Sequence, residues 1–287
     1  MKQIFKNLWT LTAATALFAG CSDKEASNAV PQDPYVRIAV SGTTSAAVKT
    51  RATTDLQSII PGLVKPDAGD LHLTLKGDNI AQLETDHDGN FIEVSRFNYS
   101  EQWDSLADYE DNQPSLFPGV YAAQLTYGDP NAIGTNAPYY AGSGSVELTR
   151  ADVGKEVLCS VSVSVANAVV RVAVDEAFRS YFADPSFRLI VNGTETEYLF
   201  TAAAGEQPVF VPAGAEVALK GSVYRPSQTA DGKGEALEVE VPARTVNGGT
   251  LSTFQFSAEA GGLEVSVRFM EPEPGSDNDF EMNDDSK

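Results

Sequence analysis

Residues 160–174 read Ser-Val-Ser-Val-Ser-Val-Ala-Asn-Ala-Val-Val-Arg-Val-Ala-Val, and this stretch is the most informative about the strand organisation of the chain. In its first half the valines stand at every second position, as Val161, Val163 and Val165. In its second half they stand one position out of step, as Val170, Val172 and Val174. Because side chains alternate between the two faces of a strand, a one-residue shift moves the apolar set to the opposite face. Either a bulge at residues 166–169 absorbs the shift, or the chain leaves one core there and enters another.

The same alternation recurs along most of the chain. Apolar residues occupy every second position in the segments 36–40, 71–75, 121–127, 237–241 and 263–269. Residues that favour turns separate such segments at 76–79, 88–90, 192–193 and 247–249. This alternation is typical of antiparallel sheets with one buried face. The sequence therefore predicts an all-β protein of two tandem antiparallel β-sandwiches, of transthyretin or immunoglobulin type.

The phase break lies near the middle of the chain, which favours a domain boundary near residue 166. We expect one β-sandwich over residues 35–165 and a second over residues 166–270. Residues 271–287 are rich in proline and acids and are expected to be disordered. One or two short helices complete the expectation. Asp175 is suited to cap a helix over residues 176–182, and residues 100–109 are a weaker candidate.

The N-terminus has the build of an export signal. Lys2 and Lys6 precede an apolar run at residues 8–18, which is too short to span a bilayer. Ala19 and Gly20 then precede Cys21. This pattern resembles the lipobox of bacterial lipoprotein signal peptides, although Phe18 stands where leucine is usual. The resemblance implies that residues 1–20 are cleaved and that Cys21 is acylated. The alternative is an ordinary secretory peptide in which the cysteine is incidental.

Residues 21–34 have few apolar side chains and no periodicity, which predicts a flexible tether. The tether opens with Ser-Asp-Lys-Glu at residues 22–25, which resembles the surface-export signal of Bacteroidota lipoproteins. That resemblance implies an outer-membrane protein that faces the cell exterior, held to the membrane lipid through acylated Cys21. The alternative is a solvated charged linker.

Charge and cysteine content narrow the functions further. The chain has 40 acidic and 20 basic residues, a net charge of −20, and removal of residues 1–20 with their two lysines makes it −22. Such an acidic chain is not suited to nucleic acid or to anionic headgroups. With Cys21 acylated, Cys159 has no disulfide partner, and its place in an apolar strand predicts a buried structural thiol.

The residues offer little to an enzyme, and we expect no catalysis, metal or cofactor. His72 falls on the polar side of its strand and His87 in a turn. Residues 86–90 resemble the start of a calcium loop, but Phe91 stands where the sixth-position glycine belongs, so a hairpin turn explains them better. Carboxylate pairs for glycoside hydrolysis stay an open alternative, because their separation depends on the fold.

Three aromatic residues are candidate ligand contacts. Trp103 is the sole tryptophan after residues 1–20 are removed, and Tyr139 and Tyr140 are neighbours in sequence. Aromatic rings stack on sugars in carbohydrate clefts, which makes these residues candidates for a glycan site. Packing in the core or at a sheet edge is the alternative for all three.

Residues 116–143 contain a Pro-Gly-x-Tyr turn, a Tyr-Gly-Asp and a Pro-Tyr-Tyr-x-Gly. These motifs resemble an uncharacterised surface lipoprotein family of gut Bacteroidota, a domain of unknown function, over about residues 35–190. The resemblance brings no catalytic residues. More distantly, the layout is similar to fimbrillin-like proteins, which implies two tandem sandwiches. It also implies protease cleavage after an arginine behind the first strand, for which Arg51 is the candidate.

Together these observations favour a lipid-anchored surface protein that is structural or adhesin-like, fimbria-related and non-catalytic. Its implied partners are other surface or fimbrial subunits, or host glycans. A glycan-binding accessory lipoprotein of the outer membrane is the alternative, and a hydrolase ranks third.

Overall fold

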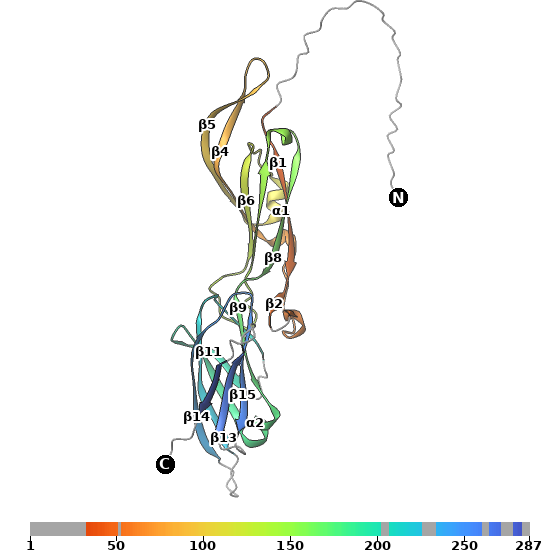
Figure 1. Ribbon diagram of the computed structural model, residues 1–287. Helices are drawn as coiled ribbons and strands as arrows, with labels where there is room; N and C mark the ends of the chain where they lie inside the picture. Colours follow the sequence, from red (N-terminus) through yellow and green to blue (C-terminus); the bar gives the residue numbers. More distant parts are fainter. Residues whose placement is uncertain are drawn as a thin grey trace, which may run out of the picture.

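The computed structural model describes residues 33–50, 53–201, 207–225, 234–259, 264–270 and 278–282. This part of the chain forms a rod of two β units placed end to end (Figure 1). We call residues 33–165 the N-terminal unit and the described residues from 166 onward the C-terminal unit. The expected all-β, sandwich-like fold with short helices is confirmed.

The N-terminal unit is built on one six-stranded sheet with the order β1-β8-β7-β6-β4-β5. Its strands are β1 (Arg37–Ser45), β4 (His72–Thr85), β5 (Phe91–Trp103), β6 (Gly119–Tyr127), β7 (Tyr140–Leu148) and β8 (Glu156–Val165). The neighbours are antiparallel except for β1, which pairs in parallel with β8. A short hairpin of β2 (Ala47–Lys49) and β3 (Thr53–Asp55) follows β1.

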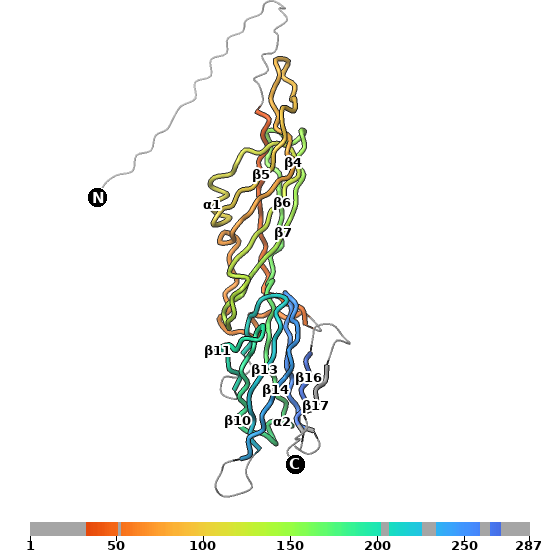
Figure 2. Tube along the Cα trace, turned by 90° about the vertical axis from the view of Figure 1, so that its left-hand side faces the viewer, coloured from red at the N-terminus to blue at the C-terminus, as the bar shows by residue number. Residues whose placement is uncertain are grey.

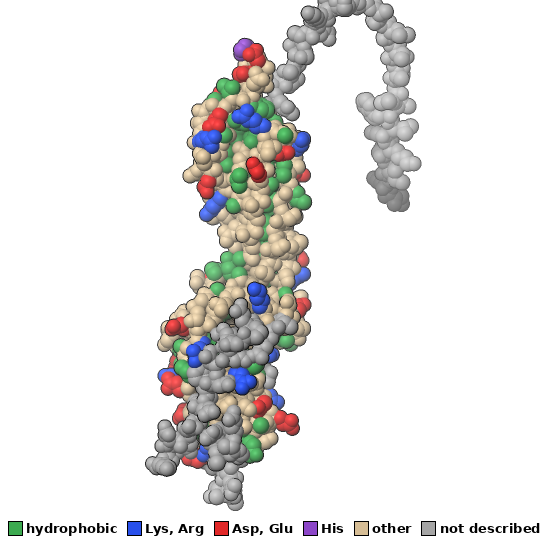
Figure 3. All heavy atoms as spheres, viewed as in Figure 1, with side chains coloured by type: hydrophobic (Ala, Val, Ile, Leu, Met, Phe, Trp, Pro, Cys, Tyr) green, Lys and Arg blue, Asp and Glu red, His purple; other side chains and the backbone are tan. Residues whose placement is uncertain are grey.

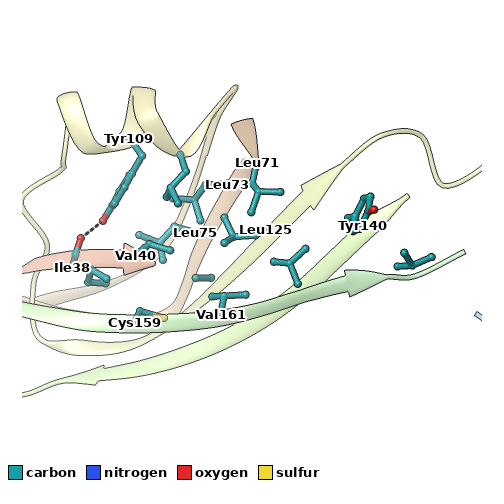
Figure 4. Close-up of a cluster of buried hydrophobic side chains, with 14 of the residues drawn as sticks. Ile38, Val40, Leu71, Leu73, Leu75, Tyr109, Leu125, Tyr140, Cys159 and Val161 are labelled. Atoms are coloured by element: carbon teal, nitrogen blue, oxygen red, sulfur yellow. Dashed lines mark hydrogen bonds between the residues drawn. The ribbon is translucent and has the colours of Figure 1, made fainter. Parts of the chain in front are cut away.

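Figure 4 shows the buried face of this sheet, from which apolar side chains point into one core: Ile38, Val40, Leu71, Leu73, Leu75, Leu125, Cys159 and Val161. The helix α1 (Leu106–Asp111) lies over this face. It begins at Ser105, whose side chain accepts the N–H of Asp108. Three 3₁₀ turns, at Leu56–Ser58, Ala68–Asp70 and Arg150–Asp152, complete the unit.

The hairpin of β4 and β5 is longer than the sheet that holds it. β4 pairs with β6 only over residues 72–77, so residues 80–85 pair with β5 alone. The register shifts between Gly77 and Ile80, where Asn79 has a φ of 55°. The turn-forming residues 76–79 therefore make a bulge inside one strand instead of the expected turn. The hairpin projects from the free end of the N-terminal unit (Figure 1).

The C-terminal unit is a sandwich of two sheets, with the orders β12-β9-β15-β16-β17 and β11-β10-β13-β14. The first contains β9 (Ala168–Val174), β12 (Val209–Val211), β15 (Leu251–Glu259), β16 (Glu264–Met270) and β17 (Asn278–Met282). The second contains β10 (Ala183–Val191), β11 (Thr194–Thr201), β13 (Glu216–Arg225) and β14 (Glu235–Thr245). Phe187 and Phe256 stack between the sheets with ring centroids 4.3 Å apart.

The helix α2 (Glu176–Tyr181) closes the far end of the C-terminal unit. Asp175 caps it as the sequence predicts, because its carboxylate accepts the N–H of Phe178 at 2.7 Å. The second helix lies further along the chain than expected. Residues 100–103 belong to β5, and α1 starts only at Leu106.

The valine phase shift coincides with the passage from one sheet to another. β8 ends at Val165 in the six-stranded sheet, and β9 begins at Ala168 in the five-stranded sheet. Val161, Val163 and Val165 belong to the core of the N-terminal unit. Val170 and Val172 belong to the core of the C-terminal unit. The structure therefore supports the second explanation for the shift, in which the chain leaves one core and enters another.

Of residues 271–287, for which disorder is expected, only residues 278–282 lie within the described part of the chain. Residues 278–282 form β17, which pairs antiparallel with β16, for example Phe280 with Val267. The acidic composition obscured an alternation of acidic and apolar residues at 279–282, which is a strand pattern.

The described chain begins in the N-terminal unit and ends in the C-terminal unit (Figure 2). β1 starts at the hairpin pole, where Arg37 pairs with Glu156 at the start of β8. β17 lies in the other unit, beside β16. The chain thus enters the fold at one pole and completes it in the unit at the other.

Candidate functional site

The three candidate ligand contacts do not meet in one site. Trp103 pairs with Leu73 on β4, and Tyr140 pairs with Tyr127 on β6. Their strands β5 and β7 are separated by β4 and β6, so three strand spacings, about 14 Å, lie between them.

Two of the three rings are also engaged in packing. Trp103 is half-buried against Tyr109, with ring centroids 4.8 Å apart. Tyr140 is fully buried, and burial raises the pKa of its hydroxyl to about 12. A surface ligand cannot reach the Tyr140 ring without opening the core, so the structure contradicts its candidacy. Tyr139 is half-buried beside the boundary between the two units.

The predicted lipidation site Cys21 and the predicted cleavage site Arg51 lie outside the described residues. Arg51 follows β2 and precedes β3, within the chain that joins this short hairpin.

The strand β1 is an edge strand that is held along both of its sides. On one side it pairs with β8 over nine residues. On the other, Val36 exchanges two backbone hydrogen bonds with Leu116, at 2.7 and 2.9 Å. Farther along, the Ile38 carbonyl accepts the hydroxyl proton of buried Tyr109 at 2.6 Å. Because Val36, Ile38 and Val40 are also buried, β1 acts as an apolar plug at the edge of this core.

Several hydrogen bonds cross the boundary between the units, and Asn167 lies at their centre. Asn167 is 1% exposed. Its side-chain oxygen accepts the N–H of Tyr139 at 3.2 Å, and its side-chain nitrogen donates to the Ala137 carbonyl at 2.9 Å. Its backbone carbonyl accepts the N–H of Gly249 at 2.9 Å. The side chain and the backbone of this one buried residue therefore tie the loop before β7 to the loop before β15.

The loop between β6 and β7 reaches across the boundary and pairs with the C-terminal unit. Gly134 and Phe210 exchange two backbone hydrogen bonds, at 2.7 and 3.1 Å. The hydroxyl of Tyr198 donates to the Ile133 carbonyl at 3.0 Å. This loop thus extends the sheet edge at β12.

The segment after β1 crosses the boundary on another side. The N–H of Lys49 donates to the Gly249 carbonyl at 2.8 Å. Gly248 sits so close to the link between β8 and β9 that a Cβ atom there would lie 2.3 Å from the Ala166 carbonyl oxygen, which only glycine avoids. Apolar packing continues through the boundary, because Val169, Phe210 and Leu251 join the core of the N-terminal unit. We call Asn167, the 133–139 loop and the 247–251 segment the junction.

The described residues hold no cluster of three or more His, Cys, Asp or Glu side chains that could bind a metal ion. At residues 86–90 the Asp86 carboxylate accepts the N–H groups of Asp88 and Asn90, at 2.9 and 2.8 Å. These bonds hold the pKa of Asp86 below 3.8, the Asn90 N–H contributing most. The carboxylate thus organises a hairpin turn.

Cys159 is buried, and burial raises the pKa of its thiol, which does not suit a nucleophile. No helix among the described residues is both long and apolar enough to cross a membrane.

A cavity of about 570 Å³ opens beside α2, between β9 and β10. Its walls are apolar and include Phe178, Phe182, Phe187 and Phe200, with Arg179 and Asp184 also on its lining. Sequence reasoning missed both this cavity and the junction. The junction had one local signal, a single amide at position 167 within a run of valines and alanines.

The profile of a protein family described as "Domain of unknown function (DUF4493)" matches residues 68–273. The match agrees with the resemblance noted in the sequence and extends it from about residue 190 to residue 273. No curated protein matches the sequence.

Several solved structures are similar in chain path. A fimbrial assembly protein from Parabacteroides distasonis is 8% identical, with 86% of this chain and 99% of that chain covered and a TM-score of 0.45. A candidate cell adhesion protein from Bacteroides eggerthii is 10% identical, with 89% and 97% covered and a TM-score of 0.36. A candidate polysaccharide-binding protein from Bacteroides thetaiotaomicron is 9% identical, with 85% and 98% covered and a TM-score of 0.33. At these TM-scores the likenesses do not establish a shared function.

Proposed function

This chain belongs to the family described as "Domain of unknown function (DUF4493)", and we propose that it is a non-catalytic surface module of adhesin-like or fimbria-related type. One observation carries the proposal. The two β units are joined end to end by a junction of backbone pairs, a buried amide and shared apolar packing. A rod whose two units are fixed in this way suits a protein that presents a binding surface at a distance from its own cell. Among the described residues, no cluster of His, Cys, Asp or Glu side chains is arranged to bind a metal ion.

We further propose that Cys21 anchors the rod to the outer-membrane lipid and that the rod faces the cell exterior. Acyl chains on Cys21 would supply the membrane affinity that so acidic a chain lacks. Cys21→Ala should abolish palmitate labelling and partition into the detergent phase. Proteinase K added to intact cells should digest the wild-type chain. Undiminished labelling of the variant would place the anchor elsewhere, and protection from proteinase would place the rod inside.

The fimbria-related part of the proposal concerns β1. Cleavage after Arg51 would remove the plug, leaving Leu116 without its backbone partner, the Tyr109 hydroxyl without its acceptor, and an apolar groove beside β8. Another extended strand could fill such a groove. A chain that lacks residues 26–51 should therefore form oligomers or bind a peptide with the β1 sequence, as measured by size-exclusion chromatography with circular dichroism. A monomer that melts earlier and binds no peptide would leave only a static module.

Glycan binding is the alternative function, and its structural support is weak. Tyr140 is buried, Trp103 packs on Tyr109, and the walls of the cavity beside α2 are apolar. Apolar walls offer few partners to sugar hydroxyls. Pull-down with polysaccharides and glycan arrays, using the chain from residue 21, would decide between the two functions.

A further inference from the structure

The outer face of the six-stranded sheet differs in composition from the rest of the chain. Seventeen side chains of its six strands point away from the core in the half nearest the junction, and none is buried. They are Ser41, Thr43, Ser45, His72, Thr74, Lys76, Ser100, Gln102, Ala122, Gln124, Thr126, Ala141, Ser143, Ser145, Ser160, Ser162 and Ser164. We call this set the hydroxyl face.

Eleven residues of the hydroxyl face are serine or threonine, Lys76 is the only one with a fixed charge, and none is acidic. The chain as a whole has 40 acidic residues and a net charge of −20. Figure 3 shows almost no Lys, Arg, Asp or Glu side chains on one stretch of the rod. This stretch lies between the junction and the charged side chains near the hairpin. The acids of the chain are therefore placed away from this face.

Two exposed apolar residues border the hydroxyl face. Leu158 precedes Ser160 on the same side of β8 and is 63% exposed. Val120 precedes Ala122 on the same side of β6 and is 57% exposed. Glu147 on β7 is the partner of Val120 and lies at the same border. Single exposed apolar side chains are common on protein surfaces, so Leu158 and Val120 only mark the border of the face.

From this composition we propose that the hydroxyl face, with its border of Leu158 and Val120, docks on the same face of a second copy of the chain. A hydroxyl group both donates and accepts a hydrogen bond, so a plane of hydroxyls is complementary to itself. A two-fold interface requires such self-complementarity, because both copies contribute the same patch. Two copies with a net charge of −20 each repel each other when they approach through their acidic surfaces. An approach through the hydroxyl face brings no carboxylates together except Glu147 at its border.

The size of the face sets the strength of the contact. Six strands at about 4.8 Å spacing and about 20 Å of strand length give about 500 Å² per copy. Stable protein pairs bury about 800 Å² per partner, so this contact is weak in solution. Confinement to a membrane raises the effective concentration to about the millimolar range, where a weak contact is populated. In this respect the inference rests on the proposed surface anchoring.

The test uses the chain from residue 21 with a C-terminal hexahistidine tag, bound to vesicles that contain a nickel-chelating lipid. Every variant carries Cys21→Ala, so the result does not depend on acylation, and Cys159 is buried. Ser143 lies near the centre of the face, where a residue meets its own copy across a two-fold axis. The test variant is Ser143→Cys, and the control is Thr194→Cys, an exposed residue of β11.

Under mild oxidation, Ser143→Cys should form disulfide dimers at least tenfold faster than Thr194→Cys at equal surface density. Adding Ser162→Glu should remove this excess, whereas adding Ser162→Ala should keep it, with unchanged melting by circular dichroism for both. Equal rates for the two cysteine variants, or an excess that survives Ser162→Glu, would overturn the proposal. Slower maleimide labelling of Ser143→Cys in the presence of dextran, with no dimer, would assign the face to a glycan instead.

Discussion

Replacing Asn167 with alanine should uncouple the two units. The change removes the acceptor of the Tyr139 N–H and the donor to the Ala137 carbonyl. It leaves the backbone bond from Gly249 in place. Asn167 is 1% exposed, so water is poorly placed to replace the lost partners.

The expected loss follows from the two orphaned groups. A buried polar group without a partner costs about 1–3 kcal/mol. Ala137 and Tyr139 are only half-buried, which places each cost near the lower end, so we expect about 2–3 kcal/mol in total. For a cooperative unit of about 200 residues this corresponds to a drop in Tm of about 5–10 °C.

Urea unfolding measures both the stability and the coupling. In the chain from residue 21 the only tryptophan is Trp103, so its fluorescence reports on the N-terminal unit alone. Far-UV circular dichroism reports on both units. The two curves should coincide in the wild type and separate in Asn167→Ala.

The matched control is Asn98→Ala, whose exposed side chain accepts only the N–H of Asn79, at 2.9 Å. It should cost under about 0.5 kcal/mol, because water can replace an exposed partner. If Asn167→Ala unfolds with the same midpoint as this control and with coincident curves, the junction does not depend on the amide.

Two further predictions concern single side chains of the N-terminal unit. Tyr109→Phe should lower the free energy of unfolding by about 1–2 kcal/mol, because the buried Ile38 carbonyl loses its hydroxyl partner. The control Tyr99→Phe removes a hydroxyl that donates to exposed Glu101 and should change the free energy of unfolding little. Equal losses of stability for the two variants in urea titrations would contradict this prediction. Because the pKa of Asp86 is lowered in the folded chain, its contribution to the hairpin turn should be present above about pH 4 and lost as the pH falls through the folded-state value. The amide NMR shift of Asn90 should follow that titration and stop doing so in Asp86→Ala, and a midpoint at the ordinary value of 3.8 or higher would refute the assignment.

The local patterns of the sequence predicted the parts of the fold that depend on near neighbours. The alternation of apolar residues predicted the strands, and the shift after Val165 marked the place where the chain changes sheets. Asp175 predicted the start of α2. Each of these depends on side chains within a few positions of one another, which is the range that a sequence pattern records.

Features that depend on distant pairing were not predictable in the same way. The parallel partner of β1 is β8, with Arg37 opposite Glu156. The local sequence pattern of either strand does not indicate which strand it pairs with. Tyr140 was a candidate ligand contact because it is aromatic, yet its place as the first residue of β7 turns the ring into the core. The value of Asn167 likewise appears only when the 133–139 loop folds back onto it.

The start of β1 at the hairpin pole determines which end of the rod would lie farther from an N-terminal anchor. If Cys21 is the anchor, the fourteen residues 21–34 can reach at most about 50 Å from the bilayer to the pole where β1 starts. The rod beyond that point is about 80 Å long, judged from the lengths of β4 and β13 laid end to end. With that anchor, the β4–β5 hairpin would stay close to the cell. The C-terminal unit, with α2 and its cavity, is the part that would meet another cell or a solid support first.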